Sequence, residues 1–157
     1  MSTLNGLPAH ALLVHFIVVL APLVAVLEIL AGLFTSVRSR LVWLILPLAA
    51  ITTALTPLTT DAGEWLEKRV GPSPALETHT ERGDWMIYIS SALLVVALLL
   101  VIVHLRERRV DSERLRVVVA IVAVLVGVTA IVQVYRIGES GARAVWGDSV
   151  SSQSSSG

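Results

Sequence analysis

Cysteine is absent from the 157-residue chain, and charged residues are scarce. Without cysteine the protein has no disulfide, no thiolate nucleophile, no thiolate-held iron–sulfur cluster and no cysteine-type zinc site. Charged residues make up 15% of the chain and hydrophobic residues 55%, whereas soluble proteins average about 25% charged and about 45–50% apolar residues. The hydrophobic residues also come in long blocks rather than in amphipathic periods. The sequence therefore predicts an integral membrane protein.

Four of these blocks are long enough to cross a bilayer as helices, which takes about 20 mostly apolar residues. They cover residues 11–34, 41–60, 85–104 and 117–135. Membrane-spanning strands would instead show alternating segments of about ten residues. We therefore expect an all-α, four-helix up-down bundle in a single domain, residues 1–147. The Ser-rich tail that follows, residues 148–157, is expected to be disordered.

The distribution of arginine predicts how the bundle is oriented. No lysine or arginine precedes Arg38, so the first block lacks the basic start of a cleaved signal peptide and is expected to remain as a helix. Arginines concentrate in the loops after the first and third blocks, "TSVRSR" and "LRERRVDSERLR". Both loops lie on one side of the membrane, and the positive-inside rule makes that side cytoplasmic. Both chain ends are then expected outside.

A few polar residues lie within the predicted spans. Glu28 is near the cytoplasmic end of the first span, where it is expected to face the bundle or an arginine-rich loop, or to extend to the interface. His104 marks the inner boundary of the third span. Three threonines of the second span follow helical spacing: Thr52, Thr56 and Thr59. Their hydroxyls either bond back to the previous turn, which we favour, or line a cavity that opens at Asp61.

The four helix ends expected outside carry a concentration of polar and titratable residues. The up-down topology makes these ends neighbours, although the chain separates them. The residues are His10, His15, Thr60, Asp61, Glu64, His79, Glu81, Asp84, Tyr135, Arg136 and Glu139. This clustering is the main functional indication in the sequence.

Histidine spacing limits the sites that this cluster offers. His10 and His15 are five residues apart, so on one helix they are turned about 140° from each other, and they do not share a face as i, i+4 zinc pairs do. If His15 faces the bundle, His79 is the best second ligand, because two imidazoles from different helices form an axial pair for haem b. His10 is the reserve ligand.

A non-haem metal such as zinc, iron or copper(II) would use a mixed set of nitrogen and oxygen ligands. The candidates are His10, His15, His79, Asp61, Glu64 and Glu139. Arg136 is expected to pair with Asp61 or Glu64, or to meet an anionic group. Each histidine also has an ordinary interpretation, a hydrogen bond to a carboxylate in the wet interfacial zone. No P-loop, Gly-x-Ser-x-Gly or His-Glu-x-x-His motif supports hydrolase or nucleotide chemistry.

Four segments together resemble domain-of-unknown-function family 2231: "LPAHALLVHF", "DAGEWLEKRV", "HTERGD" and "GESGARAVWG". The family's opening typically reads Leu-Pro-x-His-Pro-x-x-Val-His-Phe-Pro, and this chain has Ala11 and Ile17 in place of the later prolines. It also has Glu139 where the family's last motif has a histidine. The resemblance implies a four-helix protein of the bacterial inner membrane. Because some relatives are fused to Rieske-type iron–sulfur domains, the resemblance also favours electron transfer.

The sequence leaves three functions open. The leading one is a haem- or metal-binding protein that serves electron transfer through an outward-facing histidine and carboxylate site. The second is a non-catalytic accessory or scaffold subunit of a membrane complex. The third is a small solute or proton transporter that uses Asp61, Glu64 and His15. The expected partners are the lipid bilayer and a redox protein or membrane complex, and not nucleic acid.

Overall fold

A computed structural model describes the backbone of residues 3–4, 7–70, 74–107 and 113–154. Side chains are described for residues 13–65, 67–69, 74, 77–107 and 113–143. Helices make up nearly all of this part of the chain: α1 (Ala9–Leu33), α2 (Thr35–Val70), α3 (Pro74–Asp84), α4 (Met86–Glu107) and α5 (Glu113–Ser154). Ahead of α1, Thr3–Leu4 (β1) and Leu7–Pro8 (β2) form a short antiparallel pair.

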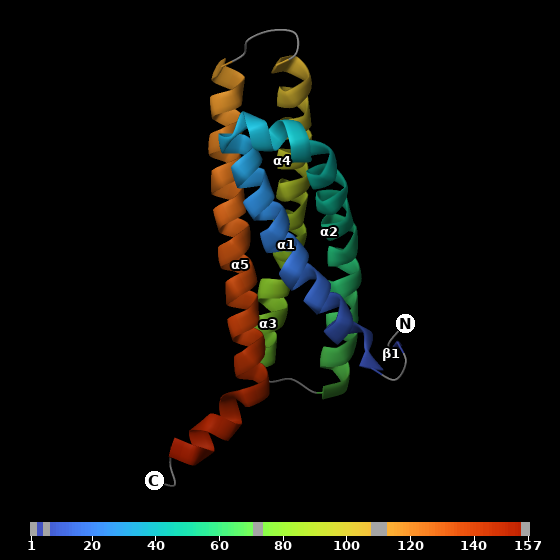
Figure 1. Ribbon diagram of the computed structural model, residues 1–157. Helices are drawn as coiled ribbons and strands as arrows, with labels where there is room; N and C mark the ends of the chain where they lie inside the picture. The colour runs from blue at the N-terminus through green and yellow to red at the C-terminus, as the bar shows by residue number, and fades with distance from the viewer. Residues whose placement is uncertain (1–2, 5–6, 71–73, 108–112, 155–157) are drawn as a thin grey trace.

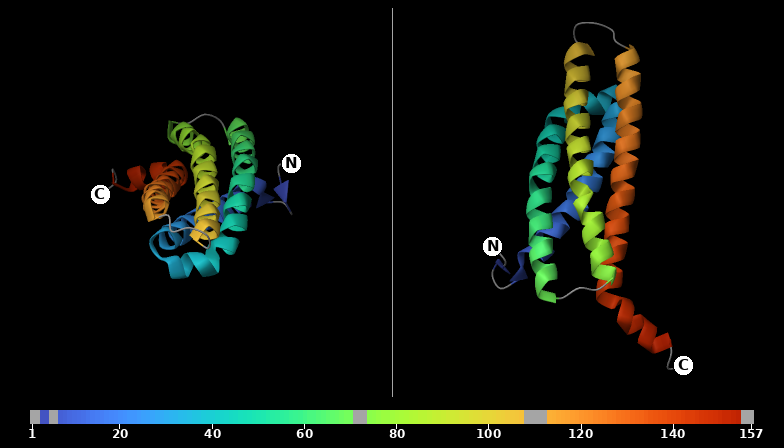
Figure 2. Two further views of the ribbon diagram at one scale, coloured as in Figure 1. Left: turned by 90° about the horizontal axis from the view of Figure 1, so that it is seen from above. Right: turned by 180° about the vertical axis from the view of Figure 1, so that it is seen from behind.

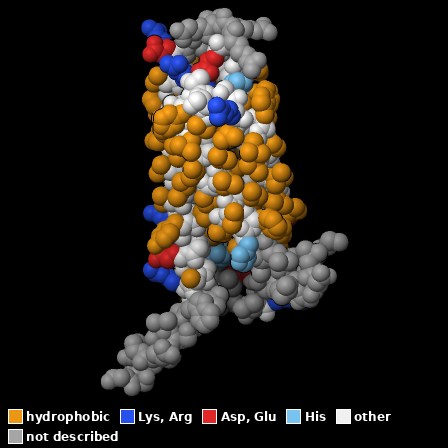
Figure 3. Space-filling view, viewed as in Figure 1, with side chains coloured by type: hydrophobic (Ala, Val, Ile, Leu, Met, Phe, Trp, Pro, Cys, Tyr) orange, Lys and Arg blue, Asp and Glu red, His pale blue; other side chains and the backbone are white. Residues whose placement is uncertain are grey.

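Four helical stretches are long and apolar enough to cross a membrane. They are Leu13–Leu33, Thr35–Arg69, Glu77–Glu107 and Glu113–Arg143. Successive stretches run in opposite directions (Figure 1). Hydrophobic side chains cover the middle of the face shown in Figure 3, and charged side chains gather towards its two ends. The prediction of an all-α, four-helix membrane bundle is confirmed.

The four long helices close into a ring. α1 packs against α2 and α5, and α4 packs against the same two helices, so the order around the ring is α1, α2, α4, α5 (Figure 2). α1 crosses the bundle obliquely, and α3 lies beside α5 at the end where α1 begins (Figure 1). The start of α1 and the end of α5 lie at this same end, as the up-down topology requires.

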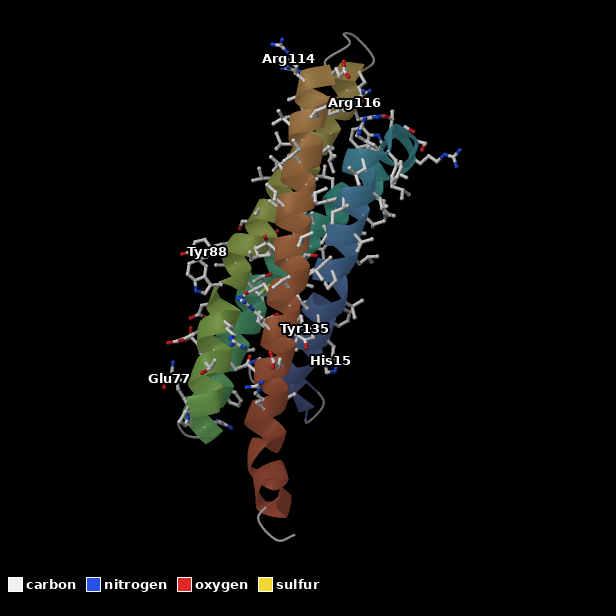
Figure 4. The ribbon with its side chains drawn as sticks, turned by 90° about the vertical axis from the view of Figure 1, so that its left-hand side faces the viewer. His15, Glu77, Tyr88, Arg114, Arg116 and Tyr135 are labelled. Atoms are coloured by element: carbon white, nitrogen blue, oxygen red, sulfur yellow. The ribbon has the colours of Figure 1, made fainter. Side chains whose placement is uncertain are left out.

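The two ends of the bundle differ in which charged and titratable residues they carry. The arginine end carries Arg38, Arg40, Arg106, Arg114 and Arg116, and the histidine end carries His15 and His79. Figure 4 shows Arg114 and Arg116 at one end, with His15, Glu77 and Tyr135 towards the other. The predicted grouping of residues at opposite ends of the bundle is therefore present.

The helices extend beyond the predicted spans because apolarity marks only the part that faces lipid. α2 begins at Thr35, so the segment expected to be a loop, "TSVRSR", is helical, and α2 continues to Val70. α5 runs from Glu113 to Ser154, through Gly138 and Gly141 and into the Ser-rich tail. Polar residues such as Glu, Lys and Arg have good helix propensity, and residues of these types carry α2 past its apolar block. The last three residues, 155–157, lie outside the described part of the chain.

Small residues let α1 and α5 approach each other closely. A methyl group at Gly127 of α5 would lie 2.8 Å from Ile29 Cδ1 and 3.1 Å from the Ala25 carbonyl oxygen of α1. A methyl group at Gly32 of α1 would lie 3.2 Å from Ala120 Cα of α5. Because lipid tails are as apolar as leucine, helices in membranes associate largely through such close packing at small residues.

Candidate functional site

The carboxylates predicted at the histidine end face water and pair locally. Asp61 and Glu64 of α2 are exposed, and Glu64 pairs with Lys68 one turn later at 3.8 Å. Glu139 of α5 pairs with Arg143 at 2.6 Å. Exposed pairs of this kind contribute only about 0–1 kcal/mol, so they do not by themselves hold the helix ends together.

Arg136 does not form either of its predicted pairs. Its side chain is exposed, and among the described residues no ion pair joins it to Asp61 or Glu64. Its backbone carbonyl instead accepts a hydrogen bond from Arg82 Nη1 at 3.0 Å. Arg82 also uses its own carbonyl to accept from Gln133 Nε2 at 3.0 Å. These two bonds join the end of α3 to α5.

The three candidate histidines have different surroundings. His10 lies in the first turn of α1, but its side chain is outside the described residues. His15 has an exposed side chain near the histidine end (Figure 4), so it does not point into the bundle as a haem ligand there would. His79 of α3 is half-buried against α5. Of the two candidate histidines whose side chains are described, His79 lies in the helix packing and His15 does not.

His79 is held by the backbone of α5. Its Nδ1 lies 3.2 Å from the Ile137 carbonyl oxygen and 3.2 Å from Ser140 Oγ. Gly141 makes room for the ring, because a methyl group there would lie 3.1 Å from His79 Cε1. α5 continues as a helix through Gly141, so this glycine serves the close packing of the His79 ring and does not end the helix.

Among the described residues, the side chains proposed as ligands do not come together around a metal ion or a haem. In the part of the chain that the structure describes, no three His, Asp or Glu side chains come together to hold a metal ion. His79 is pressed against α5 and His15 faces outward, so the two imidazoles do not border a common space for a haem. The described residues therefore give no support for either group, and haem and metal binding stay predictions from the sequence.

Buried charge lies instead at the arginine end. Arg38 of α2 is 1% exposed and lies between three helices. Its Nη1 donates to the Ala31 carbonyl oxygen of α1 at 2.7 Å, and its Nη2 donates to Thr35 Oγ1 at 3.2 Å. Towards α4, Nε donates to Glu107 Oε2 at 3.3 Å, and Nη2 pairs with Glu107 Oε1. Arg38 therefore caps the last turn of α1, whose carbonyls lack helical partners, and ties it to α4.

Glu28 lies one turn deeper in α1 than the carbonyl that Arg38 caps. Its side chain is 0% exposed, which confirms that it faces the bundle. Among the described residues, neither of its carboxyl oxygens has a hydrogen-bond partner. An ionised carboxylate without a partner is very costly in such surroundings. Glu28 thus needs either a proton or a counter-charge.

His104 is a third buried polar residue near this end. It is 6% exposed on α4, one turn before Glu107, and its ring meets Trp43 edge to face with centroids 6.4 Å apart. From the sequence, His104 indicates only the boundary of a membrane span, and Arg38 indicates only which side of the membrane its loop lies on. The sequence does not indicate that either side chain is buried. Their burial depends on how each helix is rotated, and almost uniformly apolar helices do not reveal that rotation.

The threonine stripe of α2 faces the bundle, as its spacing predicts. Thr52, Thr56 and Thr59 are buried, and each hydroxyl donates to the carbonyl four residues earlier at 2.8 Å. The favoured interpretation, bonding back to the previous turn, is confirmed. Thr53 Oγ1 also lies 2.8 Å from the Ser90 carbonyl oxygen, so it links α2 to α4.

Comparisons with known proteins give a family and no further relatives. No curated protein and no solved structure matches the chain. A family described as "Predicted membrane protein (DUF2231)" matches residues 6–154, nearly the whole chain. With the four apolar helices in place and the resemblance of its motifs confirmed, the chain belongs to this family of membrane proteins.

Proposed function

We propose that this membrane protein binds a proton within the bilayer and passes it through the helix bundle, with Glu28 as the proton-binding group. The proposal rests on the burial of Glu28. This residue is 0% exposed, and its carboxyl group has no hydrogen-bond partner among the described residues. Ionisable residues inside a membrane commonly mark proton relays and ion pathways. Of the functions considered from the sequence, proton transport is the one that uses this group.

The route from the histidine end follows the buried face of α2. Thr59, Thr56 and Thr52 place hydroxyl oxygens along this face. The Thr52 and Thr56 hydroxyls each donate to the carbonyl oxygen four residues earlier, and a hydroxyl oxygen that donates its hydrogen still has lone pairs that accept hydrogen bonds from water. Asp61 and Glu64 follow on the exposed part of α2, where they would exchange protons with water. Asp61 and Glu64 are thus part of the proton path here, as in the transporter function considered from the sequence.

The route is interrupted on the way to the arginine end. Ala49, Ile45 and Val42 continue the buried face of α2 beyond the threonines, and all three are fully buried and apolar. An apolar stretch of this kind excludes water, so the bundle would hold a proton on Glu28 rather than conduct freely. Transfer would then need a rearrangement that lets water reach this stretch.

Replacing Glu28 by glutamine tests the proposal. Purified protein in liposomes that contain a pH-sensitive dye is given a potassium diffusion potential, and proton entry is followed. Glu28→Gln should reduce the rate of proton entry at least tenfold, because glutamine keeps the shape of the side chain but does not titrate. The matched control is Glu77→Gln, which removes an exposed carboxyl from α3, away from the proposed route, and should keep most of the activity.

Equal proton entry in the wild type, Glu28→Gln and protein-free liposomes would contradict the proposal. The accessory or scaffold function would then be the better explanation of a closely packed bundle. Electron transfer through a haem or a metal is tested separately. Visible spectra of oxidised and dithionite-reduced protein detect a haem, and elemental analysis detects a metal.

We also propose that the protein lies in the bacterial inner membrane with its arginine end in the cytoplasm. Two observations support this orientation. Five arginines gather at the arginine end, and basic residues near membrane spans favour the cytoplasmic side. At the histidine end, acidic and basic residues are mixed. Both chain ends then face outward.

A further inference from the structure

We propose that Arg38 exchanges its carboxylate partner: it holds Glu107 while Glu28 carries a proton, and it turns to Glu28 when that proton leaves. The inference rests on the proposed function, because it names the counter-charge that a proton-binding carboxyl needs inside the membrane. It assigns regulation of the Glu28 site to a residue on a different helix.

The position of the guanidinium group favours this exchange. Arg38 Nη1 donates to the Ala31 carbonyl oxygen at 2.7 Å. Ala31 follows Glu28 by three residues, and both are 0% exposed, so they share the buried face of α1. Three residues correspond to about 4.5 Å along a helix axis. A long arginine side chain covers such a distance by changing rotamer.

The hydrogen bonds of Arg38 leave one donor on Nη1, the nitrogen that donates to α1. A guanidinium group has five N–H donors. The contacts to Ala31, Thr35 and Glu107 account for four of them. Within the described part of the chain, one N–H of Nη1 has no acceptor assigned, and Nη1 is the nitrogen bound to α1. Glu28, whose oxygens are both unpartnered, is the acceptor that α1 offers one turn away.

The two carboxylates differ in how well they tolerate the loss of Arg38. The Glu107 side chain is 22% exposed, whereas Glu28 is fully buried. Glu107 is able to meet water when Arg38 leaves it, but Glu28 is not. In both states Arg38 faces one ionised carboxylate, so no buried charge stays unpaired, which would otherwise cost several kcal/mol. The proton that leaves Glu28 passes to water or to the threonine route.

Among the described residues, the other charged groups at this end do not take the place of Arg38. On α4, His104 is the remaining buried titratable side chain, and on α5, Arg116 is half-buried. The remaining described charged residues of this end are exposed: Arg40, Arg106, Glu113 and Arg114. Arg38 is the cation that already contacts α1. A His104→Gln variant separates any contribution of that imidazole.

Infrared spectroscopy of the full chain in lipid tests the exchange, because a protonated carboxyl group has its own C=O stretching band. The band of Glu28 is assigned by its loss in Glu28→Gln. In Glu107→Gln, Arg38 loses its carboxylate partner and is free to hold Glu28 as an ion. The Glu28 band should therefore be lost at neutral pH in Glu107→Gln, while the wild type and His104→Gln retain it.

The matched control is Glu139→Gln, which breaks the ion pair with Arg143 at the histidine end and should leave the Glu28 band unchanged. Circular dichroism and gel filtration check that each variant remains folded. A Glu28 band of wild-type size in folded Glu107→Gln would overturn the exchange but not proton binding by Glu28. Absence of any Glu28 band in the wild type would overturn the proposed function itself.

Discussion

At the scale of single residues, the close packing of this bundle depends on glycine and alanine at the contacts between helices. Gly127 faces Ile29, and Gly32 faces Ala120, so α1 and α5 meet almost backbone to backbone. The sequence does not reveal these contacts, because an apolar helix has no polar face that indicates its rotation. For the same reason the sequence predicts that Glu28 is unusual, but it does not predict that both carboxyl oxygens lack hydrogen-bond partners among the described residues.

Replacing Gly127 by valine tests this close contact. Valine would place its Cβ 2.8 Å from Ile29 Cδ1, and overpacking of this kind costs about 1–3 kcal/mol. Gly127→Val should lower the free energy of unfolding by that amount, measured by denaturant titration in mixed micelles. Gly138→Val is the matched control, because no atom lies within 4 Å of a methyl group at Gly138. Equal effects of the two substitutions would show that the contact is unimportant.

At the scale of elements, the spans are predictable and the helices outside them are not. Blocks of apolar residues locate the four crossings, since the bilayer selects for length and hydrophobicity. They do not predict that α2 begins at Thr35 or that α3 forms over Pro74–Asp84, because these segments are polar. The sequence identifies His79 as a site residue, but its contact with Gly141 joins segments that are far apart in the chain.

A double-mutant cycle tests the contact that joins α3 to α5. Gly141→Val would press against the His79 ring, so the variant should weaken hydrogen-exchange protection of the α3 backbone. In a His79→Ala background the same substitution meets no ring, and its additional effect should be small. His79→Ala alone removes a hydrogen bond worth about 1 kcal/mol. Additive effects of the two substitutions would contradict direct contact.

At the scale of the whole molecule, one topology explains both the charge distribution and the closed ring of helices. Each end of the ring collects residues that are separated in the sequence, and the sequence predicts this correctly. It also directs attention to the histidine end, because more titratable residue types gather there. The buried charge lies at the other end, where Arg38 contacts Ala31 and Glu107. Solvent exposure, which sequence does not supply, separates the two ends.

The absence of cysteine makes the topology easy to test. Single cysteines replace Arg40 or Arg106 at the arginine end, and Glu64 or Glu77 at the histidine end, all of which are exposed. In intact cells, a membrane-impermeant maleimide should label the second pair at least tenfold faster than the first. Permeabilised cells provide the control, because all four positions should then react. Labelling of both pairs from one side would contradict the four-span topology.

The length of two helices has a mechanical consequence. α2 has 36 residues, and the described side chains of α5 extend from Glu113 to Arg143. At 1.5 Å per residue both exceed the hydrocarbon core, which is about 30 Å thick. Each helix therefore extends beyond the hydrocarbon core. A tilt of α5 that accompanied a change of partner at Arg38 would move α3 with it, because Arg82 of α3 donates a hydrogen bond to the Arg136 carbonyl oxygen of α5.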